Sequence, residues 1–124
     1  MSTLVEIIDL PLPPSVNQLF ANAGKRGRVR TPKYDAWTVE AGWALARQHP
    51  GCVSGRYALE IYIQADARFD LGNAEKALSD LLVRHCVVQD DSLAWAIHIY
   101  RDTRVSKGCR LVVRSIIGEE ERAA

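Results

Sequence analysis

The 124-residue sequence has no long apolar run, no cysteine pairs and no strong charge excess. No apolar stretch approaches the ~20 residues that a membrane-spanning helix needs, so we expect no membrane partner. The first residues lack a charged segment followed by a hydrophobic block, which argues against a secretory signal. We therefore expect a cytoplasmic protein.

Cysteine is scarce as well, with three residues in the chain. Cys52, Cys86 and Cys109 are odd in number and far apart, so they fit neither a disulfide framework nor a CxxC metal site. Idle thiols are the best interpretation. The three histidines show no mutual metal-ligand spacing, and we assign them no chemistry.

The formal net charge is only +1 at pH 7, which argues against a basic coat over the whole surface. Any affinity for nucleic acid must therefore come from local patches. Hydrophobic residues make up 48% of the chain, enough for a packed core. The length fits one domain, residues 1–124, with a frayed polar tail at 118–124. Because such a core is small, a homodimer that buries more surface is expected.

The hydrophobic pattern alternates between segments typical of strands and of helices. Thr31 followed by Pro32 is typical of a helix start, and Pro50-Gly51 ends that helix. The pattern predicts strands at 3–9, 57–65, 93–101 and 109–117, helices at 32–48 and 70–84, and a loop at 17–33. This order predicts an α/β (α+β) fold: one two-layer domain with a mixed or mostly antiparallel sheet and two helices on one face.

The predicted loop at 17–33 is the one segment with a strong charge asymmetry. No acid interrupts its basic residues, which would bind phosphates without sequence preference. A solvated surface loop is the alternative interpretation. Aromatic side chains nearby could stack on unpaired bases, although core packing is favoured for Trp37. The basic residues are Lys25, Arg26, Arg28, Arg30 and Lys33, and the other aromatics are Tyr34 and Phe69.

Acidic residues flank the second predicted helix. Asp70 stands at its start, Asn73 and Lys76 lie inside it, and the pair Asp90-Asp91 precedes the next strand. Two or three carboxylates and a lysine are the minimal set for metal-assisted phosphodiester cleavage, because carboxylates hold Mg²⁺ and a lysine neutralises developing charge. The alternative is that Asp70 only caps the helix and that Asp90-Asp91 is a solvated turn.

Three segments together resemble one known family. They are LPLPPSVNQLF near the start, RFDLGNAEKALSDLLVRHCVVQDD in the middle, and the turn with Lys107-Gly108 before the last strand. The middle segment is similar to a D-x-D-N-x-x-K-x-x-x-D-x-L motif that ends in a paired Asp. In this combination the chain resembles the RusA-type Holliday junction resolvases, small phage- and prophage-associated endonucleases also described as crossover junction endodeoxyribonucleases.

The resemblance implies a Mg²⁺-dependent homodimer, with Mn²⁺ as a possible substitute. It would bind four-way DNA junctions in a bacterial or phage-infected cell and make paired symmetric cuts in recombination and repair. By position in the motif, Asp70 and Asp91 match the catalytic, metal-binding aspartates and Lys76 the catalytic lysine. Asn73 matches the motif asparagine. Lys107 and Arg104 in the last predicted turn could extend the basic patch. The expected DNA contacts beyond the basic loop's cations are Asn17, Asn73, Phe69 and Lys107.

The sequence departs from this family pattern at Gly72, where the motif has its second aspartate. The site could work with two carboxylates and waters, which Mg²⁺ tolerates. Another acid could substitute, and Glu75 is the best candidate because it lies three residues further on the same helix face. Asp90 and Asp66 are weaker candidates. The third explanation is an impaired site, which leaves a branched-DNA-binding protein; a flap or branched-DNA nuclease is a further alternative.

Overall fold

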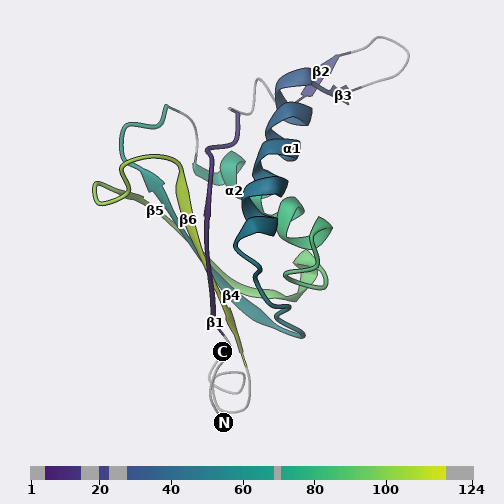
Figure 1. Ribbon diagram of the computed structural model, residues 1–124, viewed down its shortest axis with the longest axis vertical. Helices are drawn as coiled ribbons and strands as arrows, with labels where there is room; N and C mark the ends of the chain where they lie inside the picture. The colour runs from purple at the N-terminus through teal and green to yellow at the C-terminus, as the bar shows by residue number, and fades with distance from the viewer. Residues whose placement is uncertain (1–4, 15–19, 23–27, 69–70, 117–124) are drawn as a thin grey trace.

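The computed structural model describes residues 5–14, 20–22, 28–68 and 71–116. Helices α1 and α2 pack on one face of a four-stranded sheet, as Figure 1 shows. This two-layer arrangement confirms the predicted fold class. Its elements are β1 (Val5–Leu10), β2 (Phe20–Asn22), β3 (Arg28–Arg30), α1 (Pro32–Arg47), β4 (Tyr57–Gln64), α2 (Leu71–Arg84), the 3-10 helix η3 (Asp91–Leu93), β5 (Ala94–Asp102) and β6 (Cys109–Ser115).

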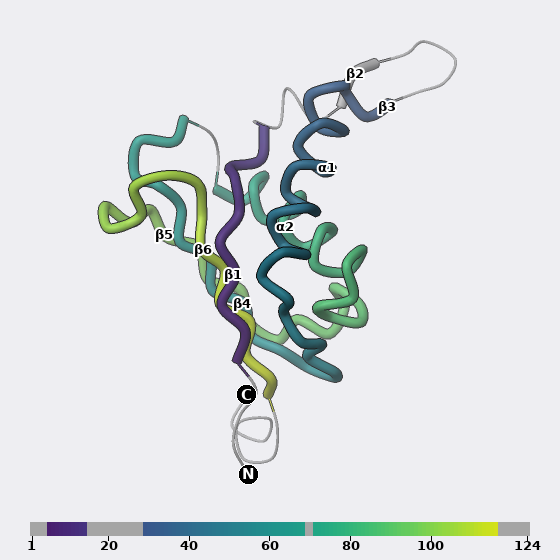
Figure 2. The backbone as a smooth tube through the Cα atoms, viewed as in Figure 1, coloured from purple at the N-terminus to yellow at the C-terminus, as the bar shows by residue number. Residues whose placement is uncertain are grey.

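The sheet is mixed, with strand order β1-β6-β4-β5. β6 pairs antiparallel with both β1 and β4, whereas β4 and β5 are parallel. Parallel neighbours need a crossover, and α2 supplies it between β4 and β5. The trace in Figure 2 follows β1 alongside β6 and shows α2 behind α1. The helix that carries the predicted site residues is therefore tied to the sheet at both ends.

Two sequence predictions need correction in detail. The segment 17–33 is not entirely a loop, because β2 and β3 pair antiparallel within it. Strands of three residues are too short to produce a readable alternation. In addition, residues 91–93 form η3, so the third long strand begins at Ala94 and extends to Asp102. The last strand ends at Ser115. The predicted tail at 118–124 lies outside the described residues.

The core lies between the sheet and the two helices. Every second residue of β4 is fully buried, beginning with Tyr57, because alternate side chains of a strand point to one face. Fully burying an aliphatic side chain of this kind stabilises the fold by about 1.5–3 kcal/mol. The Trp37 indole N–H donates to the Pro11 carbonyl at 3.0 Å, which fastens the proline-rich segment to α1. Trp37 is 5% exposed, so it is a core residue rather than a base-stacking platform.

The end of α2 turns the chain back toward β4. Cys86 adopts a left-handed conformation (φ 60°), and the Val87 N–H donates to the Leu82 carbonyl at 2.9 Å. This is a Schellman motif, which stops a helix and reverses the chain. Val53 N–H then donates to the Val87 carbonyl at 2.7 Å, so the segment before β4 runs beside the segment that leads to Asp90.

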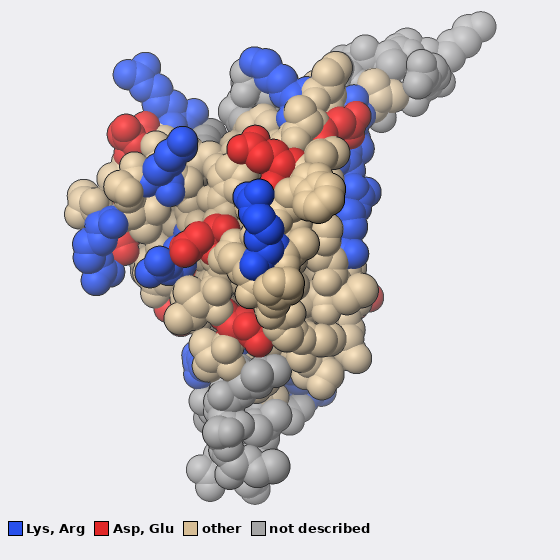
Figure 3. Space-filling view, viewed as in Figure 1, with Lys and Arg blue, Asp and Glu red and all other residues tan. Residues whose placement is uncertain are grey.

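Charge on the molecule is mixed rather than one-sided. On the face drawn in Figure 3, acidic and basic side chains intersperse over the helices and the strand ends. This agrees with the small net charge of the chain. None of the helices in the described ranges is long and apolar enough to cross a membrane.

Candidate active site

Four carboxylates of α2 and of the turn at η3 influence one another through their charges, and we call Glu75, Asp80, Asp90 and Asp91 the acidic cluster. A hydrogen bond to Asp90 raises the pKa of Asp91, and desolvation adds to the effect. The negative charges of Asp90, Asp80 and Glu75 raise it further. Three of the four carboxylates, those of Asp80, Asp90 and Asp91, line one pocket. The crossover from α2 through η3 to β5 brings them together.

The pKa values of the two adjacent aspartates are shifted in opposite directions. Asp90 caps η3, and its carboxylate accepts the Ser92 N–H at 3.1 Å. This bond and the hydrogen bond from Asp91 lower the pKa of Asp90. A pair of acids in contact titrates as one unit, with the last proton on Asp91 in this arrangement. Cation binding here must compete with that proton.

Glu75 is held in a fixed position within the cluster. Its carboxylate accepts a hydrogen bond from the Ser79 hydroxyl at 2.6 Å, one helical turn further along α2. Ser79 is only 3% exposed, so this bond is shielded from water. Gly72, where the family motif has an acid, precedes Glu75 by three residues on the same helix. Ser79 therefore fixes the orientation of the Glu75 carboxylate, whose charge acts on Asp91.

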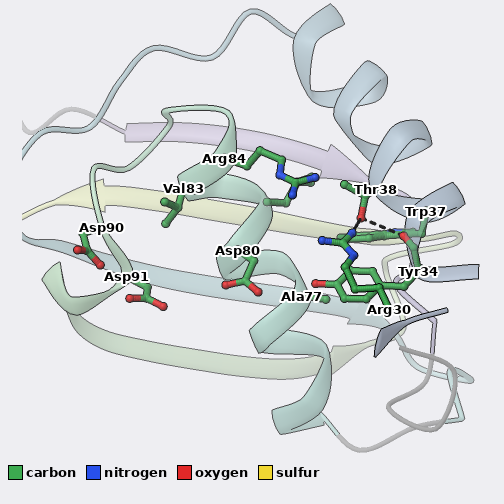
Figure 4. A pocket seen from close by; sticks show the side chains of 11 residues that line it. Arg30, Tyr34, Trp37, Thr38, Ala77, Asp80, Val83, Arg84, Asp90 and Asp91 are labelled. Atoms are coloured by element: carbon green, nitrogen blue, oxygen red, sulfur yellow. Dashed lines mark hydrogen bonds between the residues drawn. The ribbon is translucent and has the colours of Figure 1, made fainter. Parts of the chain in front are cut away.

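A pocket of about 300 Å³ opens beside the cluster, between α1, α2 and η3. In Figure 4, Asp90 and Asp91 line one end, Asp80 lies between, and Arg30 and Arg84 line the other end. An acidic end for a cation and a basic end for an anion suit a phosphate group with its metal ion.

The two arginines of the pocket are held differently. Arg30 is clamped by Asp35 at 2.9 Å and Thr38 at 2.6 Å, and it lies over the Tyr34 ring at 4.0 Å. Arg84, in the last turn of α2, makes no hydrogen bond or ion pair within the described ranges. It is therefore available to an incoming anion.

The remaining predicted site residues are spread over different parts of the chain. Asn73 and Lys76 lie on α2, with Lys76 exposed, and Lys33 is exposed at the start of α1. Lys107 lines a different pocket with Asp9 and Arg110, so the structure does not bring it to the acidic cluster. Of Arg28 only the backbone, in β3, is described. Outside the described residues lie Asp70, Phe69, Asn17, Lys25 and Arg26.

Sequence reasoning missed four residues of this region. Asp80 stands at the last aspartate of the quoted family motif and Ser79 follows Glu75 by four positions, so the motif and the helical spacing would have found them. Arg84 carries the same signal, four residues beyond Asp80. Tyr57 had no such signal, because in the sequence it is simply one apolar position of an alternating strand.

The residues present fit Mg²⁺. The cluster offers hard carboxylate oxygens, the donors that this ion prefers. Across residues 5–14, 20–22, 28–68 and 71–116, no three His, Cys, Asp or Glu side chains converge closely enough to hold a metal ion. Mg²⁺ often takes one or two carboxylates, with water and substrate phosphate completing its shell. One buried hydroxyl beside these acids, that of Tyr57, also lacks a partner.

One comparison with known proteins identifies a family for the chain. A family model described as Endodeoxyribonuclease RusA matches residues 11–114, most of the chain. The chain therefore belongs to the RusA endodeoxyribonuclease family, and its resemblance to that family is confirmed. Membership supports a nuclease that acts on DNA. The comparison with curated proteins found no match.

Proposed function

We propose that the protein is a Mg²⁺-dependent endonuclease that resolves four-way DNA junctions by paired symmetric cuts in recombination and repair. The observation that carries this proposal is the pocket with carboxylates at one end and arginines at the other. Membership in an endodeoxyribonuclease family supports it. Mn²⁺ is expected to replace Mg²⁺, since it accepts the same oxygen ligands.

In this proposal Asp91 and Asp70 are the main ligands of the ion. Glu75 supplies the carboxylate that Gly72 lacks, and Asp90 assists from the cap of η3. The ion, when bound, activates water and relieves charge at the leaving oxygen. The protein holds that ion only when Asp91 has released its proton, because the protonated acid is a poor ligand.

The cations of the site act on the phosphate. Lys76, exposed on α2, neutralises charge that develops on the scissile phosphate. Arg84 and Arg30 at the basic end of the pocket bind a phosphate of the same strand. The other proposed DNA contacts are Lys25, Arg26, Arg28, Lys33, Asn17, Asn73, Phe69 and Lys107.

Two symmetric cuts need two sites related by a two-fold axis, so we include a homodimer in the proposal. The sheet face opposite the helices carries apolar side chains for it, with Val5 44% exposed, Ile7 59% and Tyr100 45%. Ile7→Lys should convert the dimer to a monomer in light scattering, because a charge would be buried between the copies. A wild-type monomer at micromolar concentration would contradict this part.

The deciding experiment compares a synthetic four-way junction with a flap and a linear duplex, each with Mg²⁺ or Mn²⁺. We expect symmetric nicks in the junction and little cutting of the duplex. Asp70→Asn should abolish cleavage and keep binding, since the ion is lost while the cations remain. Binding without nicking by the wild type would instead favour a non-catalytic branched-DNA-binding protein, and preferential flap cutting would identify a different nuclease.

A further inference from the structure

We propose that Tyr57 is a positioning residue of the acidic cluster, whose hydroxyl donates a hydrogen bond to the Asp91 carboxylate when Mg²⁺ is bound. This inference rests on the proposed function, because it concerns the same ion. It concerns a side chain that the family motifs quoted above do not include.

The Tyr57 hydroxyl is an anomaly of the core. Tyr57 is 0% exposed, at the first position of β4. Its oxygen is the one buried side-chain polar atom without a hydrogen-bond partner in the part of the chain that is described. Leaving a hydroxyl buried and unpaired costs about 1–3 kcal/mol, so phenylalanine would pack here at lower cost. A hydroxyl kept at such a place indicates a partner that arrives later.

Three contacts bring Tyr57 beside the paired aspartates. Val53 forms a bridge with Val88, and the Gly55 N–H donates to the Gln89 side chain at 3.0 Å. Tyr57 itself lies opposite Ala94, the residue that follows η3. The segment from Gln89 to Ala94 is thus attached to the start of β4 on both sides of Asp90-Asp91.

The surroundings of the phenol keep it a donor. Burial raises the pKa of Tyr57 to about 12, and the charges of Asp91, Glu75 and Asp90 contribute in that order. The hydroxyl is therefore neutral and protonated at pH 7, and carboxylates are its natural acceptors. Asp91 is the favoured acceptor because it begins η3, which ends next to Ala94, the residue paired with Tyr57.

Binding of an ion changes which hydrogen-bond donors the Asp91 carboxylate requires. Once Asp91 is an ionised ligand, its second oxygen requires another donor, and such outer partners fix a ligand's orientation. Tyr57 presents a buried donor at that place. Ser79 already performs the equivalent task for Glu75 at 2.6 Å.

Tyr57→Phe tests the inference by Mg²⁺ titration calorimetry and thermal unfolding, both without DNA. The ion-free variant should unfold at the wild-type temperature or above it, because an unpaired hydroxyl has been removed. Its Mg²⁺ affinity should fall about 10-fold or more, the loss typical for removal of a ligand's hydrogen-bond partner. Tyr62→Phe is the matched control, since that hydroxyl donates to Glu60 on the opposite face of β4. Its affinity should equal the wild type's.

The outcomes separate the two proposals. Unchanged Mg²⁺ affinity in Tyr57→Phe overturns the positioning role, and so does an equal loss in Tyr62→Phe. A lower unfolding temperature without ion, with affinity intact, identifies Tyr57 as core packing only. If wild-type protein binds no Mg²⁺ and cuts no junction, the proposed function fails and this inference fails with it. Wild-type cleavage with an unaffected Tyr57→Phe variant overturns the inference alone.

Discussion

Ser79→Ala is the sharpest test of how the site is built. The hydroxyl of this buried serine donates to Glu75 at 2.6 Å. A hydrogen bond to a charged group contributes about 1.5–3 kcal/mol, and the lower end applies because Glu75 is partly exposed. Alanine regains about 0.5 kcal/mol of helix propensity over serine. The net loss of unfolding free energy should be about 1 kcal/mol.

That loss should be visible by calorimetry. For a chain of this length the unfolding entropy makes 1 kcal/mol correspond to a shift of about 4 °C in Tm. The same substitution should weaken Mg²⁺ binding about 10-fold or more, because Glu75 loses the partner that orients it. Ser115→Ala is the matched control, since it removes the other buried serine, on β6 rather than α2. Its Mg²⁺ affinity should not change.

The result that would refute this reasoning is specific. If Ser79→Ala lowers Tm while Mg²⁺ binds with wild-type affinity, the serine only stabilises α2 and Glu75 is not a ligand. If Tm rises, the hydrogen bond contributes less than the difference in helix propensity, and Glu75 is not held by Ser79 in solution.

Three further predictions concern the same site. Glu75→Gln should lower cleavage and Mg²⁺ affinity, and adding Gly72→Asp should restore both; failure of the double variant to recover would show that the two positions are not equivalent. Arg84→Ala should weaken junction binding and reduce its salt dependence by about one phosphate contact, measured by a salt titration; an unchanged slope would contradict that contact. The pKa of Asp91 is raised, so Mg²⁺ affinity should begin to fall at a higher pH than it would for an ordinary aspartate as the solution is acidified. The stability of the ion-free protein should change in the opposite direction: the contribution of Asp91 to the free energy of unfolding should be lost as pH rises through the same pKa. Titrations of wild type and Asp91→Asn across the acidic range check both signs, and identical pH profiles would refute the assignment.

Much of the fold was predictable because its long elements have strong periods. β4 alternates over eight residues, and α2 places its apolar residues on one face. The strands β2 and β3 were missed because three residues cannot establish a period. The boundary at η3 was missed because one turn of 3-10 helix uses the same Asp-Ser composition as a plain turn.

The site was only partly predictable, for a different reason. Residues linked by helical spacing, such as Glu75 and Ser79, can be paired from the sequence. Contacts between elements that are distant in the sequence cannot be paired in this way. Arg30 reaches the pocket from β3, and Tyr57 reaches the acidic cluster from β4, and no local pattern relates either residue to α2. The parallel pairing of β4 with β5 determines where Tyr57 lies relative to Asp90-Asp91.

The absence of a carboxylate at Gly72 bears on the proposed roles of both Glu75 and Tyr57. Its missing carboxylate would leave the cluster one ligand short, and two structural features bear on that shortage. Glu75 stands one turn further along α2 with its orientation fixed by a buried serine. Tyr57 presents, from the sheet side, a buried hydroxyl that has no partner among the described residues and that we propose as a donor to ion-bound Asp91. A site with fewer carboxylates depends more on holding each one still, because every misoriented ligand costs a larger share of the affinity. Tyr57→Phe should therefore damage Mg²⁺ binding less in a Gly72→Asp background than in the wild type, and an equal loss in both would separate the roles of the two positions.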